Sequence, residues 1–403
     1  MLRSFVAAAV GFHAGRQLAR WLAVVALALA ALGAASWAMA VGDAAPPGLP
    51  AGWPLFRGDS QARGIASRSL PAEMALLWRF RVENGAFEGT PVIADETVYI
   101  GDLDGTVYAL ELARGTERWR YETESGFVAA PAVAGGRVYI GDIDGQFHCL
   151  DARTGERLWQ VAAQAEISAG ANFYRQYVLF GSQDATLYCL KAETGQLAWK
   201  MSINDQIRCS PTVAGDRALV AGCDSRLHIV DLARGAAAAQ VDIRSPTGVT
   251  PAVEKERAFF GTEGGEFFCV DWARAEVLWT HRADDQQRPS IRSCPAVSGG
   301  QVVYGSRDRH VYALDTETGQ PRWSFAARQR VDSSPVIAGD RVLVGSSDGR
   351  LYVLDLATGE ALWQYEAGGG FTGSPAVAAG RVVIANENGV VYCFGKAPEP
   401  RGN

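Results

Sequence analysis

Histidine and cysteine are the side chains whose chemistry would be easiest to recognise here from their spacing. The 403-residue chain has five histidines and seven cysteines. His281 and His310 stand alone, and no histidine or cysteine pair has the short separation of zinc ligands. No nucleophile stands at a motif spacing from a base, and the glycine-containing stretches recur along the chain as turns do. The sequence therefore predicts no catalytic, metal-binding or cofactor-binding residue.

Most of the chain is built from a repeat of roughly forty residues, the length typical of a four-stranded propeller blade. The proline that opens each unit is Pro91, Pro131, Pro211, Pro251, Pro295, Pro335 or Pro375, with Ala171 in the one vacant position. The tryptophan near its end is Trp119, Trp159, Trp199, Trp279, Trp323 or Trp363, with Ala239 in the vacant position. Each unit holds four short alternating apolar runs separated by Asp-Gly and Thr-Gly turns, which predict four antiparallel strands.

The two ends of the repeat are incomplete in complementary ways. An isolated strand, Leu76 to Phe80, precedes the first unit and carries Trp78, whereas the last unit stops after three strands at Gly395. The early strand can complete the last blade and remove its open edge. We therefore expect an all-β protein, an eight-bladed β-propeller of four-stranded antiparallel blades closed by an N-terminal strand. Its blades start near residues 87, 127, 167, 207, 247, 291, 331 and 371.

Several cysteines and histidines occupy fixed positions of the repeat. One position takes alanine, valine or isoleucine in some units and, in others, Cys149, Cys189, Cys269 or Cys393. Such a position indicates apolar packing. His148 and His228 stand where other units have an aromatic residue, so packing is again the simpler interpretation. Cys209 and Cys223 flank the turn from Ala214 to Arg217, and two interpretations stay open for them: a disulfide, or two packed thiols.

The best candidates for contacting a partner lie three positions before the repeat proline. A regular ring would bring these residues together at one mouth of its channel. They are Glu88, Val128, Ser168, Arg208, Gly248, Arg292, Asp332 and Thr372. The one extension of the repeat, Ala283 to Arg288, is expected on the same face. The candidate partner-binding residues are Glu88, Arg208, Arg292, Asp332, Asp284, Asp285 and Arg288; the alternative is that they are surface ions that neutralise one another.

The run from Ala313 to Trp323 has the pattern Ala-x-Asp-x-x-Thr-Gly-x-x-x-Trp, and near-complete copies end at Trp159, Trp199 and Trp363. It resembles the tryptophan-docking motif of the PQQ-type β-propeller repeat family. The architecture of the repeat region resembles the BamB-type propellers, which are subunits of the outer-membrane β-barrel assembly machinery. The resemblance implies that each tryptophan stacks on the neighbouring blade, and it implies no chemistry. The docking residues would be Trp78, Trp119, Trp159, Trp199, Trp279, Trp323 and Trp363.

Blade four departs from this pattern because Ala239 replaces its docking tryptophan, and blade five has Ala275 at the turn glycine. We expect the fourth blade to be the weakest joint of the ring.

Quinone-dependent dehydrogenases share the propeller, but their family pattern adds insertions with a calcium site, a catalytic aspartate and often adjacent cysteines. Here no two cysteines are neighbours, and the repeat is extended only once, by a few residues. We therefore expect no cofactor and no enzymatic activity, because a shared fold does not imply a shared function.

The N-terminal residues differ from the repeat in composition. Residues 1–42 combine Arg3, Arg16 and Arg20 with an apolar run from Trp21 to Leu32 and an Ala-x-Ala end at Ala40. They predict either a cleaved signal peptide or an uncleaved membrane anchor, and both export the remainder of the chain. Residues 43–52 are expected to be a linker, 53–397 the propeller and 398–403 a tail.

Net charge is −6 and long basic runs are absent, so the sequence carries no electrostatic signature of nucleic-acid binding. Together with the resemblance, this predicts a non-catalytic protein-interaction scaffold in the periplasm or cell envelope, with an accessory role in outer-membrane protein assembly. Its expected partners are proteins, with membrane contact only through an uncleaved N-terminal segment. The alternatives are an envelope protein that binds a small ligand or carbohydrate and, last, a quinone-dependent dehydrogenase.

Overall fold

The computed structural model describes residues 48–71, 73–83, 85–283 and 287–397. These residues form strands, turns and loops. Within them, no helix is long and apolar enough to cross a membrane. The expected signal or anchor segment, residues 1–42, and the expected tail lie outside the described residues.

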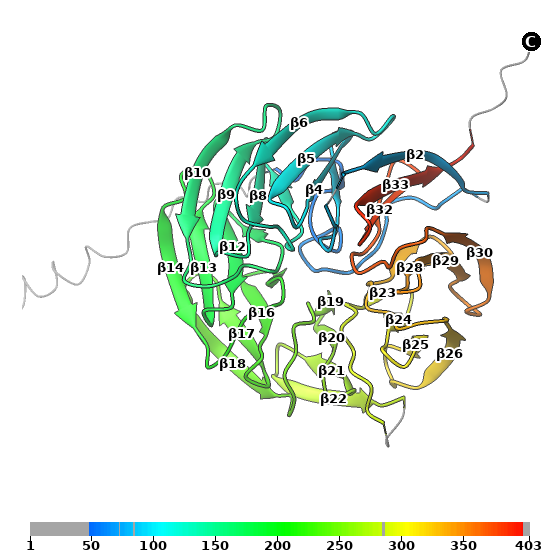
Figure 1. The fold of residues 1–403 in the computed structure, drawn as a ribbon. Helices are drawn as coiled ribbons and strands as arrows, with labels where there is room; N and C mark the ends of the chain where they lie inside the picture. Colours follow the sequence, from blue (N-terminus) through cyan, green and yellow to red (C-terminus); the bar gives the residue numbers. More distant parts are fainter. Residues whose placement is uncertain (1–47, 72, 84, 284–286, 398–403) are drawn as a thin grey trace, which may run out of the picture. The chain divides into compact units, whose positions relative to one another are not determined.

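Eight four-stranded antiparallel units surround a central channel, which confirms the eight-bladed propeller (Figure 1). The innermost strands are β3 (Val92–Ala94), β7 (Ala132–Ala134), β11 (Asn172–Tyr174), β15 (Thr212–Ala214), β19 (Ala252–Glu254), β23 (Ala296–Ser298), β27 (Val336–Ala338) and β31 (Ala376–Ala378). The second strands are β4 (Thr97–Gly101), β8 (Arg137–Gly141), β12 (Tyr177–Ser182), β16 (Arg217–Ala221), β20 (Arg257–Gly261), β24 (Gln301–Gly305), β28 (Arg341–Gly345) and β32 (Arg381–Asn386).

The third strands are β5 (Thr106–Glu111), β9 (Gln146–Asp151), β13 (Thr186–Lys191), β17 (Arg226–Asp231), β21 (Phe267–Asp271), β25 (His310–Asp315), β29 (Arg350–Asp355) and β33 (Val390–Gly395). The outer strands of the first seven blades are β6 (Glu117–Glu122), β10 (Arg157–Ala162), β14 (Leu197–Ser202), β18 (Ala236–Asp242), β22 (Glu276–His281), β26 (Pro321–Ala326) and β30 (Ala361–Glu366). The eighth blade takes its outer strand, β2 (Ala75–Arg81), from the N-terminal part of the chain.

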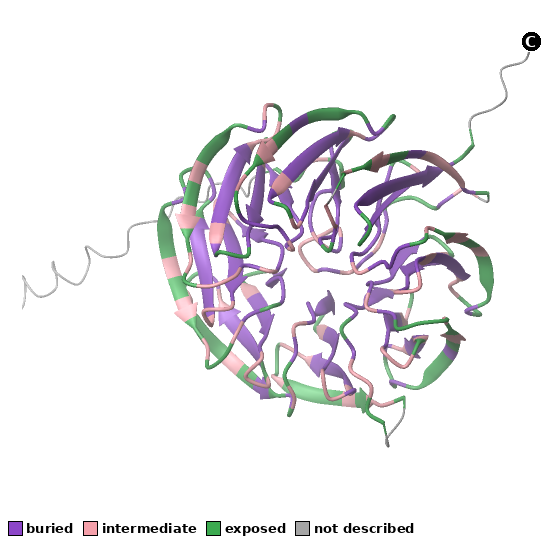
Figure 2. Ribbon diagram, viewed as in Figure 1, coloured by how far each residue is buried: buried purple, intermediate pink, exposed green. Residues whose placement is uncertain are grey.

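Burial divides each blade into an inner and an outer part (Figure 2). All five residues of β4 are buried, because neighbouring blades cover both faces of its sheet. The outer strand β30 instead alternates between exposed and half-buried residues. The core is therefore the stack of inner strands, and alternate positions of each outer strand face solvent.

The closure of the ring through the N-terminal strand is confirmed. β2 pairs antiparallel with β33 from Ala75↔Gly395 to Arg81↔Val390, with a bulge between Leu76 and Trp78. This pairing covers the edge of β33 that would otherwise be open to other chains.

Indole rings from the outer strands dock on the turn of the next blade. A Cβ on Gly155 would come within 2.6 Å of the Trp119 ring, and the same relation joins Gly319 to Trp279. A side chain would displace the ring, so glycine is needed there in addition to its φ of +77°. Four indoles also donate a hydrogen bond to a carbonyl of that turn: Trp78 to Leu112, Trp119 to Ala152, Trp279 to Thr316 and Trp323 to Leu356.

The seam between blades four and five contains an indole after all, supplied from the opposite side. Trp272 of blade five packs in the same apolar cluster as Ala239 of blade four, and its Nε1 donates to the carbonyl of Lys255 at 2.9 Å. Ala275 adopts a φ of +57°, which alanine tolerates here because no docking tryptophan lies over it. A groove of about 570 Å³ remains between Ala239 and Trp272. The loss of the docking tryptophan therefore does not leave this seam without an aromatic side chain, and the weakness of blade four stays a prediction.

Candidate functional site

One end of the central channel opens into a cavity of about 270 Å³. All eight residues expected at the channel mouth line it, because each lies in the loop that leads from one outer strand to the next innermost strand. The structure thus brings together Glu88, Arg208, Arg292 and Asp332 of the candidate partner-binding set. Arg288 is exposed and does not line this cavity, whereas Asp284 and Asp285 lie outside the described residues.

Ion pairs at the mouth involve residues that sequence reasoning missed. Arg307 also lines the cavity. It donates two hydrogen bonds to Asp332, from Nε to Oδ1 at 2.8 Å and from Nη2 to Oδ2 at 2.9 Å. These hydrogen bonds raise the pKa of Arg307 above its ordinary value. Arg292 Nε lies 2.8 Å from a carboxylate oxygen of Glu263. The sequence contained no signal for these pairs, since Arg307 and Glu263 belong to turns between second and third strands.

Below the mouth, a belt of hydrogen bonds joins five consecutive seams. The residue before each repeat proline donates its N–H to the side chain of the equivalent residue in the next blade. The donors and acceptors are Ser210 to Thr250, Thr250 to Cys294, Cys294 to Ser334, Ser334 to Ser374, and Ser374 to Thr90, at 2.9 to 3.3 Å. Ala130 and Gly170 interrupt the belt, and Phe56 also lines the cavity beside them.

The other end of the channel is closed by the segment from Gly52 to Ala66, which we call the floor segment. It begins with β1 (Gly52–Trp53), which pairs with β3. Its carbonyls then accept backbone hydrogen bonds from the innermost strands of blade two and of blades four to seven. These bonds run from Val133 to Pro54, Val213 to Ser60, Val253 to Gln61, Val297 to Arg63 and Ile337 to Gly64, at 2.8 to 3.0 Å. The free edges of the innermost strands are thereby satisfied from within the ring.

Arg57 anchors this floor segment with a guanidinium that is almost entirely buried, at 1% exposure. Its Nη2 donates to the carbonyls of Pro295, at 3.1 Å, and Pro335, and its Nη1 donates to Ser334 at 3.4 Å. Burial lowers the pKa of Arg57 to about 10. Backbone carbonyls of blades six and seven therefore stabilise this buried cation through hydrogen bonds.

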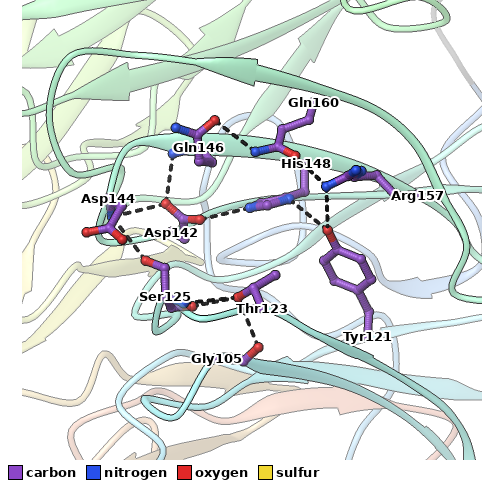
Figure 3. Close-up of polar contacts among 10 residues, drawn as sticks. All are labelled: Gly105, Tyr121, Thr123, Ser125, Asp142, Asp144, Gln146, His148, Arg157 and Gln160. Atoms are coloured by element: carbon purple, nitrogen blue, oxygen red, sulfur yellow. Dashed lines mark hydrogen bonds and ion pairs between the residues drawn. The ribbon is translucent and has the colours of Figure 1, made fainter.

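Aromatic residues of the third strands pack between blades as expected, and they also bind the turn aspartates. In blade two, His148 Nε2 lies 2.9 Å from Asp142, and its Nδ1 lies 3.3 Å from the Tyr121 hydroxyl of blade one (Figure 3). Tyrosine takes the same place elsewhere: Tyr108 donates to Asp102, Tyr188 to Asp184 and Tyr312 to Asp308.

These His–Asp pairs have the composition of a catalytic dyad, but they are too buried for a substrate to reach them. The side chains of His148 and Asp142 are each only 2% exposed, and His228 pairs with Asp224 in a similarly buried position. Burial lowers the pKa of His228 despite the nearby carboxylate. Because tyrosine replaces histidine in other blades, the shared role is to tie the third strand to its turn. Within the described residues, no group of three His, Cys, Asp or Glu side chains could hold a metal ion.

Cys209 and Cys223 are both free thiols, so the disulfide interpretation is not supported by the structure. β15 pairs with β16 from Thr212↔Leu219 to Ala214↔Arg217. Continuing this register would place Cys209 opposite Gly222, so Cys209 and Cys223 would point to opposite faces of the sheet. Cys149, Cys189, Cys269 and Cys393 are buried, in line with apolar packing.

Comparisons with known proteins agree with this architecture. A structure of BamB from Moraxella catarrhalis matches with a TM-score of 0.70 and 20% identity, over 82% of this chain and 100% of that one. The computationally designed Ika8 protein matches with a TM-score of 0.71 and 19% identity, over 80% and 99%. Quinohemoprotein alcohol dehydrogenase from Comamonas testosteroni matches with a TM-score of 0.74 and 15% identity, over 87% and 82%. At these identities the matches show the shared fold alone.

No curated protein matches the sequence significantly. A family model does match, in three overlapping parts that cover residues 70–170, 144–238 and 223–401. Its description is "Outer membrane protein assembly factor BamB". These parts span nearly the whole ring, from the closing strand β2 to the end of β33. The chain therefore belongs to the family of the outer membrane protein assembly factor BamB.

Proposed function

We propose that this protein is a non-catalytic protein-interaction scaffold of the cell envelope with an accessory role in outer-membrane protein assembly. The observation that carries the proposal is the contrast between the channel ends: the floor segment occupies one end, and a ring of polar and charged loop residues surrounds the other. Loops held by a rigid ring are well suited to protein recognition. Family membership supports the assembly role, and the export segment expected from the sequence supports the envelope location.

The size and lining of the cavity favour a scaffold over a small-ligand protein. A drug-sized ligand usually occupies roughly 300–1,000 Å³ of mostly apolar space. The mouth cavity has about 270 Å³, and its lining mixes arginines, carboxylates and hydroxyls with apolar residues such as Phe56, Val128 and Ala169. The charged residues of this cavity can bind a polar side chain of a protein partner.

A dehydrogenase role is the less favoured alternative, although quinoprotein enzymes share the fold. The floor segment fills the channel end opposite the mouth, and the chain has no adjacent cysteines. Titration of the purified protein with pyrroloquinoline quinone and calcium, followed by calorimetry, tests this alternative. Saturable micromolar binding would favour the enzyme and contradict the scaffold.

The scaffold proposal can be tested by site-specific photo-crosslinking in the cells that produce the protein. A photoreactive amino acid at Val128 or Thr372, both at the mouth, should give adducts with subunits of the outer-membrane assembly machinery. The same amino acid at Glu193, in an exposed turn at the opposite end of blade three, is the control. Equal adducts from both faces, or saccharide binding without protein adducts, would contradict the proposal.

A further inference from the structure

The face that surrounds the mouth, called here the mouth face, consists of two sets of loops. One set leads from each outer strand to the next innermost strand, and the other joins second and third strands. Backbone hydrogen bonds hold the two sets together, as from Leu103 to the carbonyl of Ala86 and from Ile143 to that of Gly126. These loops therefore form a single surface whose charges act together on a partner.

In one part of the mouth face all the charged side chains are acidic. The described mouth-face loops between residues 82 and 207, which belong mainly to blades one to three, contain carboxylates and no lysine or arginine. We call them the acidic sector. The carboxylates that reach solvent are Glu83, Glu88, Asp104, Glu124, Asp144, Glu166 and Asp205.

A second part of the mouth face has a surplus of arginine. In the loops between residues 208 and 335, the basic sector, the exposed cations are Arg208, Arg244, Arg288, Arg292, Arg309, Arg328 and Arg330. The described carboxylates of these loops are already bonded within the protein. Glu263, Glu266 and Asp332 bind arginines, Asp224 binds His228 and Asp308 binds Tyr312.

Arg208 brings this surplus into the cavity, and Arg292, whose Nε is paired with Glu263, lies there as well. They lead into blades four and six, and Gly248 holds the equivalent position of blade five between them. A Cβ on Gly248 would have only Arg208 within 4 Å, so the space beside this glycine is otherwise open. Arg208 is held by Gln206 at 2.9 Å, a neutral partner that leaves its positive charge uncompensated.

Resting on the proposed protein-interaction role, we propose that the basic sector docks an extended acidic segment of a protein partner, with one carboxylate seated in the cavity against Arg208 and Arg292. A guanidinium matches a carboxylate with two parallel hydrogen bonds, which gives both strength and geometric specificity. The cavity volume suits one such side chain. Basic residues elsewhere on the partner would face the acidic sector and fix its orientation.

A peptide fits this surface better than a nucleic acid does. A phosphate chain needs a continuous basic track, whereas here Glu263 and Asp332 interrupt the arginines and the acidic sector borders them. The net charge of −6 also opposes non-specific attraction of polyanions. Binding of an acidic peptide would therefore have to depend on local arginines.

A fluorescein-labelled decaglutamate peptide is a suitable probe, with decaglutamine as the uncharged control. Fluorescence anisotropy at low and physiological salt should show that the full chain binds the acidic peptide and not the neutral one. The double variant Arg208→Glu/Arg292→Glu should lose at least about tenfold in affinity. A matched double variant, Arg153→Glu/Arg234→Glu, makes the same charge change in exposed turns outside the mouth face and should stay within about twofold. Melting curves of both variants exclude unfolding as the cause.

Equal weakening by the two double variants would overturn the proposal, because binding would then reflect net charge alone. Tighter binding of a ten-nucleotide deoxythymidine strand with the same arginine dependence would overturn it in favour of nucleic acid. In the cellular crosslinking experiment, undiminished adducts with Arg208→Glu/Arg292→Glu would overturn this inference while leaving the scaffold role intact. Loss of adducts only in that variant would support both.

Discussion

The two ends of the channel use the same side chain for different purposes. At the floor, Arg57 is buried and donates to the carbonyls of Pro295, Ser334 and Pro335. At the mouth, Arg208 and Arg292 are exposed and meet Gln206 and Glu263 at the rim. The guanidinium of Arg57 is desolvated, so its stabilisation depends on hydrogen bonds that exist only in the folded protein. The guanidinium groups of Arg208 and Arg292 are exposed to solvent and can contact a partner.

This difference teaches where stability and function lie in the ring. A buried cation is tolerated only while its hydrogen-bond partners stay in place, so removing either side is costly. An exposed arginine contributes little to folding because solvent screens it. The floor should therefore determine stability and the mouth should determine recognition.

Replacement of Arg57 should give the largest difference in stability between a change at the floor and the same change at the mouth. Arg57→Met keeps much of the side-chain length but leaves three buried carbonyls without their donor, which should lower the free energy of unfolding by about 3 kcal/mol or more. Arg208→Met at the mouth should change it by less than about 0.5 kcal/mol. Urea denaturation measures both, and similar losses in the two variants would refute the division of roles.

A change beside Arg57 sharpens the comparison. Gly64 has a φ of +67°, and a Cβ there would collide with the Arg57 guanidinium. Gly64→Ala should therefore cost about 2–3 kcal/mol, of which the left-handed backbone explains only about 1–2. Gly215→Ala, at φ +58° in an open turn, isolates the backbone part. If thermal denaturation shows that Gly64→Ala and Gly215→Ala lose equal stability, the Arg57 side chain must be able to move away from the new methyl group.

The belt between floor and mouth should have an intermediate effect. Thr250→Val removes the hydroxyl that accepts the N–H of Ser210 and leaves that buried donor unpaired, at a cost of about 1–2 kcal/mol. Thr372→Val at the mouth removes a bond to the exposed Glu387 and should cost less than about 0.5 kcal/mol. Denaturation midpoints distinguish the two variants. If Thr250→Val left the midpoint unchanged, the belt would not contribute to the stability of the ring.

Mild acid should destabilise the packing between neighbouring blades rather than the floor or the mouth of the channel. Burial lowers the pKa values of His228 and His281 below the ordinary 6.5, so folding disfavours their protonated forms. The unfolded chain binds protons more readily, and stability is therefore full above pH 6.5 and falls as the pH drops below it. The loss is at most about 1.4 kcal/mol per histidine per pH unit.

His228→Gln keeps a donor towards Asp224 but does not titrate, and it should reduce the loss of melting temperature between pH 7 and 5. Gly64→Ala should retain the full pH dependence, because the floor segment contains no histidine. An unchanged slope in His228→Gln would assign the acid sensitivity to other groups.

Local patterns predicted most of the ring. The prolines, tryptophans and Asp-Gly turns each describe a few neighbouring residues, and their repetition carries the same strand pattern around the molecule. The closing strand was predictable because Trp78 stands in the docking position and the last blade lacks one strand. The mouth residues were predictable for the same reason, since equal spacing in each unit places them at equal depth in the ring.

The seam between blades four and five shows where such patterns stop being sufficient. Ala239 correctly indicated a missing docking residue, but Trp272 enters the seam from a repeat position held elsewhere by Leu112, Ala152 or Leu232. The unusual tryptophan at that position was the available signal. The groove that remains beside it can be judged only from the packed structure.

By itself the sequence determined the blade, the number of blades and the residues at the mouth, because each depends on contacts repeated at short range. Only the tertiary structure decided the floor. Arg57 belongs to the floor segment, which follows no repeat, and it donates hydrogen bonds to carbonyls that lie 238 to 278 positions away in the sequence. It likewise decided the charge pairs at the rim, the separation of Cys209 from Cys223 and the division of the mouth face into two sectors. These features arise from the closing of the ring, which brings together residues that no spacing along the chain relates.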